Sequence, residues 1–195
     1  ANIIAGNGSG VVTMSLGATN VQDQTILRNS IHSNSGGTVS TLGHDLLSTT
    51  NFTTFTSAGP TANGSGDPDT GPNNFMNFPV ISDVSSKGDD VTLTYDLDIN
   101  VAEAGATGYR VEFFANTAAD PSGHGEGEIF LGADTVAGDA TGRSVTLSNT
   151  SLDLGTYEFT STTTMTDNSA DGFGHTSEFS AVFAAAVTAA SSDSD

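Results

Sequence analysis

The chain lacks cysteine and tryptophan and has only four basic residues in 195. Without cysteine it can form neither disulfide bonds nor thiolate metal sites. The net charge of −19 excludes nucleic acid as a natural partner, because phosphate binding needs clustered Lys and Arg. It also argues against binding to anionic membrane surfaces. No apolar run is long enough to span a bilayer, so membrane insertion is not expected.

Motifs of catalysis are also missing. The sequence contains no G-x-S-x-G elbow, no H-E-x-x-H pair and no G-x-x-x-x-G-K-[ST] loop. Paired carboxylates such as Glu126 and Glu128 could in principle cleave glycosidic bonds. They lack the aromatic platform that sugar cleavage normally needs, because the chain has three tyrosines and no tryptophan. We therefore expect a protein that is not an enzyme.

The second half of the chain has the pattern of an all-β domain. Val91, Leu93, Tyr95, Leu97 and Ile99 fall on every second position, which predicts a half-buried strand. Further strands are predicted at 79–84, 109–115, 129–136, 143–147, 156–166 and 177–187. Seven short strands separated by turns indicate an immunoglobulin- or fibronectin-like β-sandwich over residues 78–188.

The N-terminal region contains a short internal repeat. Residues 2–7 and 29–34 both read N-x-I-x-x-N, so that Asn2 corresponds to Asn29 and Asn7 to Asn34. A repeat of this length, with Asn beside a short apolar strand, is typical of a parallel β-helix coil, in which Ile stacks inward and Asn bonds to the Asn above it. We expect residues 1–47 to be a β-helix-like or strand-donating region. One or two coils cannot bury their own apolar faces. The region must therefore pack against an upstream part of a longer protein, a neighbouring subunit or the second domain.

Two further segments differ in composition. Residues 48–77 are rich in Ser, Thr, Gly, Asn and Pro and contain a rapid series of turn signals, which predicts a linker packed down by Phe52 and Phe55. Residues 189–195 form an acidic tail.

Six segments, in this order, resemble the junction in large secreted bacterial surface proteins where a parallel β-helix ends and a β-sandwich module follows. The segments are residues 29–34, 67–80, 111–116, 120–123, 125–127 and 176–181. The resemblance implies that architecture and an extracellular or cell-surface location, and it implies no single activity. The chain departs from the pattern by an insertion at 168–174 that lengthens the turn before the last strand.

The inserted turn carries the most specific candidate metal site. Asp167, Ser169 and Asp171 fall at positions 1, 3 and 5 of a twelve-position calcium loop, with Gly next for the bend. The carbonyl of Phe173 would supply position 7 and Glu178 position 12. The alternative is an ordinary solvated turn, because Asp and Gly are common in β-turns and no helix pair flanks the segment.

Two weaker acidic groups could also bind Ca²⁺. Asp67 and Asp69 precede two asparagines in the linker, and Asp120 lies near Glu126 and Glu128. For both groups, turn formation and solubility are the alternative explanation.

Taken together, the sequence predicts an extracellular structural protein: a surface module or a self-assembling subunit of a filament or tube, strengthened by Ca²⁺. Its expected partners are copies of itself, head-to-tail, or upstream modules of the same protein. An adhesin or carbohydrate-binding module of a longer secreted protein is the alternative.

Overall fold

The computed structural model describes residues 1–17, 20–36, 42–49, 59–99, 103–118, 120–148, 150 and 152–185. The predicted acidic tail and the predicted linker anchors Phe52 and Phe55 lie outside these ranges. The described elements are strands apart from two short 3-10 turns. They are β1 (Ile3–Ala5), β2 (Val11–Leu16), β3 (Ser30–His32), β4 (His44–Thr49), η1 (Pro72–Phe75), β5 (Val80–Lys87), β6 (Asp90–Leu97), β7 (Gly108–Asn116), β8 (Ile129–Val136), β9 (Ala140–Leu147), η2 (Leu154–Thr156), β10 (Glu158–Thr166), β11 (Phe173–Thr176) and β12 (Phe183–Ala184). Within the described ranges, no helix has the length and apolar character needed to cross a membrane.

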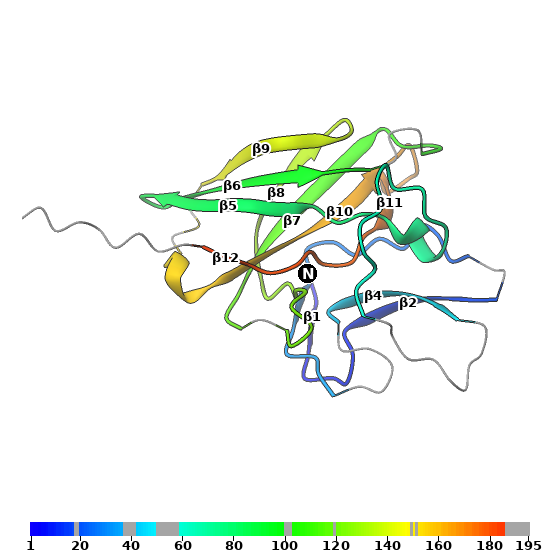
Figure 1. The fold of residues 1–195 in the computed structure, drawn as a ribbon, viewed down its shortest axis with the longest axis horizontal. Helices are drawn as coiled ribbons and strands as arrows, with labels where there is room; N and C mark the ends of the chain where they lie inside the picture. The colour runs from blue at the N-terminus through cyan, green and yellow to red at the C-terminus, as the bar shows by residue number, and fades with distance from the viewer. Residues whose placement is uncertain are drawn as a thin grey trace, which may run out of the picture.

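The strands from β5 onward form two facing sheets, an arrangement consistent with a β-sandwich (Figure 1). One sheet has the order β5-β6-β9; the other has the order β11-β10-β7-β8, with β12 also paired to β10. Their inner faces share one apolar core that includes Leu93, Tyr95, Phe113 and Phe159, each fully buried. We refer to residues 79–185 as the sandwich region.

The predicted alternation is confirmed in β6, where Val91, Leu93, Tyr95 and Leu97 are all buried. The structure differs from the prediction of one strand over 177–187. β11 ends at Thr176, before this range, and within the described residues 177–185 the strand is the short β12. The stretch between the two strands follows β10 partly through side chains. The hydroxyls of Ser177 and Ser180 accept the backbone N–H groups of Thr163 and Ser161, so side-chain oxygens replace carbonyls of a regular ladder.

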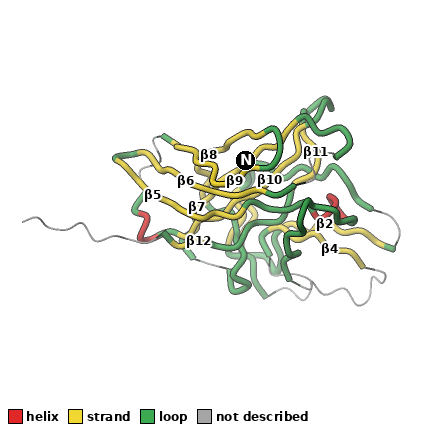
Figure 2. The backbone as a smooth tube through the Cα atoms, turned by 45° about the horizontal axis from the view of Figure 1, so that its top comes forward, coloured by secondary structure: helices red, strands yellow, loops and turns green. Residues whose placement is uncertain are grey.

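Residues 1–49, which we call the N-terminal region, contain two pairs of parallel strands. β1 pairs with β3, and Ile4 lies opposite Ile31, as the repeated motif predicts. β2 pairs with β4, and Val11 lies opposite His44. The β2·β4 pair lies beneath the sheets of the sandwich region, and Figure 2 shows it from a second direction.

The asparagines of the two motifs are also in contact, as predicted. The backbone N–H and the side-chain amide of Asn2 both donate to Oδ1 of Asn29, at 3.0 and 3.1 Å. Asn7 makes the same two bonds to Oδ1 of Asn34, at 3.1 and 3.2 Å. We call β1 and β2, which come first in the chain, the outer layer, and β3 and β4, which pair with them, the inner layer.

Candidate functional site at the seam of the two regions

Strand β7 is buried on both faces. Val111, Phe113 and Ala115 belong to the apolar core of the sandwich region. The alternate residues of the same strand, Glu112 and Phe114, are equally buried but face the N-terminal region, where Phe114 packs against Ile31. We call this contact between the N-terminal region and the outer face of the sandwich region the seam.

Glu112 is a fully buried carboxylate in the middle of the seam. One oxygen accepts the backbone N–H of Arg28 at 2.8 Å, and the other accepts Nε of Arg110 at 2.8 Å. A buried charge is tolerated when it is paired and hydrogen-bonded. Glu112 therefore connects the backbone at Arg28 to β7, and its negative charge is paired with the guanidinium of Arg110.

Glu126 and Gly127 close the edge of the inner layer. The two oxygens of Glu126 accept the backbone N–H groups of Ser33 and Asn34, at 2.7 and 2.9 Å. Gly127 exchanges two backbone hydrogen bonds with Ile31, of 2.7 and 2.9 Å. The edge of β3 that faces away from β1 is thus paired, which removes an open strand edge.

Glu178 makes a third contact of the same kind. Its oxygens accept the backbone N–H groups of Leu46 and Thr61, at 2.8 and 2.7 Å. Its carboxyl group also contacts that of Asp45, and both residues are almost completely buried. Burial, with Asp45 as a neighbour, raises the pKa of Glu178 to about 7, so the two carboxyl groups retain a proton in mildly acidic solution.

His44 is held as a neutral side chain next to this pair. Nδ1 lies 2.9 Å from the carbonyl oxygen of Ser177, so that nitrogen carries the proton and donates it. Nε2 then accepts from the hydroxyl of Thr13, at 3.2 Å. Complete burial lowers the pKa of His44 to about 4, although the bond to Ser177 acts in the opposite direction.

Asn73 fastens the linker to the seam. Its side chain accepts the backbone N–H of Gln24 and donates to the carbonyl oxygens of Gln24 and Thr176, with bonds of 2.8 to 3.0 Å. Its backbone is left-handed, with φ of 45°, a conformation that Asn tolerates better than most residues. A fully buried amide with three bonds fixes the N-terminal region, the linker and β11 together.

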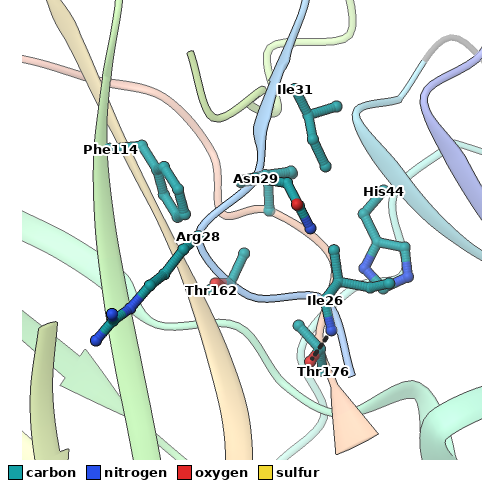
Figure 3. A pocket seen from close by; sticks show the side chains of 9 residues that line it. Ile26, Arg28, Asn29, Ile31, His44, Phe114, Thr162 and Thr176 are labelled. Carbon is teal, nitrogen blue, oxygen red and sulfur yellow. Dashed lines mark hydrogen bonds between the residues drawn. The ribbon is translucent and has the colours of Figure 1, made fainter. Parts of the chain in front are cut away.

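A small cavity of about 10 Å³ lies inside the seam, between residues 26–31 and the sheet (Figure 3). In the figure, Ile26, Ile31 and Phe114 surround it, and the side chain of Arg28 points away from it. The hydroxyl of Thr162, also in its wall, has no hydrogen-bond partner among the described residues. The volume is enough for about one water molecule, so the seam is closely packed.

An acidic pocket of about 270 Å³ lies beside the seam and is lined by Asp67, Asp69, Asn74 and Glu103. The structure thus brings together the predicted Asp67 and Asp69 and adds Glu103. Burial, with Glu103, Asp69 and Asp98 as neighbours, raises the pKa of Asp67 to about 7. Glu103 is partly neutralised, because its Oε1 lies 3.1 Å from Nε2 of His175.

His175 joins this pocket to the N-terminal region. Its Nδ1 lies 3.0 Å from Oδ1 of Asp23, on the opposite side from Glu103. Burial alone would lower the pKa of His175, but the two carboxylates outweigh burial and raise it. The side chain is therefore a further polar link across the seam.

The residues of the predicted calcium loop are only partly together. Ser169 lies between Asp167 and Asp171, with its hydroxyl 2.5 and 2.7 Å from their Oδ1 atoms. Phe173 begins β11 next to them. Glu178 does not join this group, because both of its oxygens are bonded at Leu46 and Thr61.

The second predicted acidic group is also divided. Asp120 accepts the backbone N–H of Ser122 in its own turn, at 2.8 Å. Glu128 accepts the backbone N–H and the hydroxyl of Thr117, at 2.8 and 2.7 Å, and Glu126 binds the N-terminal region as described above. Across the described ranges, no three carboxylate or imidazole groups are arranged to hold a metal ion. Calcium binding stays a prediction.

Four buried residues of the site were not predicted from the sequence: Glu112, Asp45, Glu103 and His44. A signal for Glu112 was present, because the strand V-E-F-F-A-N carries bulky residues on both faces, which predicts that both faces are covered. The other three lie in loops or at a strand end, where no periodicity distinguishes a buried residue from an exposed one.

No family model matches the chain, and no curated protein sequence matches it either.

Proposed function

We propose that the protein is a non-catalytic structural segment of an extracellular or cell-surface assembly. In this proposal the N-terminal region forms the last layers of a parallel β-helix, and an immunoglobulin- or fibronectin-like sandwich closes its end. The observation that carries the proposal is that Glu112, Glu126 and Glu178, all from the sandwich region, accept backbone N–H groups of the N-terminal region. Such contacts cap a sheet edge that would otherwise pair with other chains.

Calcium is part of the proposal because the surface is strongly acidic. Asp167 and Asp171 in one loop, and Asp67, Asp69 and Glu103 in the acidic pocket, offer carboxylate oxygens of the kind that Ca²⁺ prefers. A cation at either place would relieve repulsion in a chain of net charge −19. It would then stiffen the module or bridge neighbouring subunits in a filament or tube.

An adhesin or carbohydrate-binding module is the second candidate. The burial of Tyr95 and Tyr109 in the core does not favour it, because sugar-binding faces normally expose aromatic rings. A glycan array separates the two candidates: binding to a glycan supports the second candidate, and binding to none supports the first.

The proposed function is tested by the size and stability of the purified chain in millimolar Ca²⁺ and in chelator. Light scattering, negative-stain microscopy and thermal unfolding are measured in both conditions. Ordered polymers that disperse on chelation, or a calcium-dependent rise in the unfolding temperature, support the proposal. The double variant Asp167→Asn with Asp171→Asn should remove the calcium effect if the loop binds the ion, whereas Asp83→Asn on the exposed face of β5 is the matched control. A compact monomer that is indifferent to calcium contradicts both polymerisation and calcium binding.

A further inference from the structure

The two layers of the N-terminal region end differently. The inner layer is closed at Glu126 and Gly127, which bond to residues 31, 33 and 34. The outer layer is open, because β1 pairs with β3 and β2 pairs with β4, and neither has a second partner among the described strands. Among the described residues, the inner layer therefore has hydrogen-bond partners on both of its sides, whereas the outer layer has strand partners on one side only.

Burial follows the same direction. Ile31 in the inner layer is 1% exposed, its partner Ile4 in the outer layer is half-buried, and the neighbouring Ile3 is 78% exposed. Backbone bonds show which groups remain available. Asn2 and Gly6 bond toward β3, and alternation along a paired parallel strand turns the N–H and C=O groups of Ile3 and Ala5 toward the open side.

The asparagine contacts give the open face a polarity. In both pairs the outer residue donates twice and the inner residue accepts through Oδ1, from Asn2 to Asn29 and from Asn7 to Asn34. The Oδ1 atoms of Asn2 and Asn7 are the equivalent acceptors of the outer layer. A group that completes this pattern must present an N–H and a side-chain amide at two positions with the same spacing as Asn2 and Asn7.

We infer that the open face of β1 and β2 binds one further parallel layer with an Asn-x4-Asn pair, supplied by polypeptide N-terminal to residue 1. This inference rests on the proposed function and identifies its partner. Parallel strands joined within one chain need a connection of about a dozen residues or more, which the separation between Asn2 and Asn29 already provides.

A second copy of the chain does not meet these requirements. In a copy, the matching donors would have to come from the inner layer, where they are already used: the backbone N–H of Asn34 donates to Glu126, and its side-chain amide donates to the carbonyl oxygen of Ile4. Two open faces placed against each other would bring Oδ1 of Asn2 against another acceptor. The capped inner layer thus makes the stack grow in one direction only.

The test is a variant in which residues 1–27 are repeated once ahead of Ala1. We expect the added layer to raise the thermal midpoint by about 4 °C or more, which corresponds to stabilisation of roughly 1–2 kcal/mol. Amide hydrogen exchange at Ile3, Ala5, Val12 and Met14 should slow at least tenfold. The matched control carries Asp in place of the two added asparagines equivalent to Asn2 and Asn7, and it should lose most of both effects, because Asp has no amide to donate.

Three outcomes would overturn the inference. The first is a repeat that leaves the midpoint and the four amides unchanged. The second is an equal gain with the Asp control. The third is self-association of the parent chain that is abolished by Ile3→Lys, because a second copy would then be what covers the open face of β1 and β2.

A second probe keeps the inference testable should the repeated variant fail to fold. A peptide with the sequence of residues 1–27 is added to the parent chain, and failure to protect the four amides at millimolar peptide counts against the inference. Glu126→Gln changes the closed side of the inner layer instead. Its effect on stability therefore tests the capping of the inner layer in the proposed function, independently of the open face.

Discussion

The two regions of this molecule are held together by different forces. In the sandwich region, one large cluster of buried apolar residues fills the space between the sheets. At the seam, the apolar cluster consists of Ile31, Phe114 and Phe179, and buried glutamates bonded to backbone N–H groups surround it. Apolar burial is non-directional and tolerates repacking. Buried carboxylates require particular hydrogen-bond partners, so the seam specifies one docking geometry. For the same reason, a single substitution at the seam can cost more stability than a substitution that the apolar core can repack around.

The largest expected effect comes from the apolar core. Phe159→Ala removes a fully buried ring and should lower the free energy of unfolding by about 4 kcal/mol, from lost burial and the cavity that remains. Urea unfolding followed by far-UV circular dichroism measures it. Both regions should lose stability together, because the N-terminal region docks on a sheet that this core supports. A loss confined to the sandwich region would contradict this dependence.

Glu178→Ala should act at the seam, at a cost of about 3 kcal/mol, because the buried N–H groups of Leu46 and Thr61 lose their acceptors. Hydrogen exchange should then accelerate in β4 much more than in β6. Asp83→Ala, an acidic residue exposed on β5, is the matched control and should change stability by less than about 0.5 kcal/mol. Equal acceleration in β4 and β6 would show that the seam is not a separate unit.

The pH dependence tests the polar character of the seam through His44. Its pKa is lowered to about 4, so its contribution to stability is present above the unfolded pKa near 6.5 and is lost as pH falls toward 4. The stability advantage of the parent over His44→Gln should therefore shrink by about 2 kcal/mol between pH 7 and pH 5.

The neighbours of His44 are Asp45 on its own strand and Glu178 across the seam. The raised pKa of Glu178 has the opposite sign, since that stability is lost as pH rises through about 7. Glu178 is present in both chains, so its contribution cancels in the difference. Urea midpoints at half-unit pH steps measure the effect, and a constant difference between the chains would contradict the buried neutral state of His44.

The smallest effect is expected for a surface contact of the sandwich region. Arg143 pairs with Asp134, which also accepts the hydroxyl of Tyr95 from the opposite sheet. Because Arg143 is largely exposed, Arg143→Ala should lower the free energy of unfolding by less than about 1 kcal/mol, and less still in about 0.5 M salt. A loss as large as that of Glu178→Ala would mean that ion pairs also hold the sheets together.

Several features could be predicted from the sequence because they depend on local periodicity. Alternation placed the core residues of β6, and the repeated N-x-I-x-x-N motif placed Ile4 over Ile31 and Asn2 over Asn29. Residues 111–116, 125–127 and 176–181, which carry Glu112, Glu126 and Glu178, meet at the seam. Their chemistry was predicted differently, because the spacing around Glu178 suits a calcium loop, whereas the structure turns this carboxylate toward Leu46.

The sequence by itself determined the fold class, the strand faces and the pairing of the two asparagine motifs, since each depends on residues with a regular spacing. The tertiary structure alone decided which carboxylates are buried and what they bind. An acidic residue is stable inside only where distant backbone N–H groups or basic side chains converge on it. That convergence brings together residues as far apart as Leu46 and Glu178, and no local pattern encodes it.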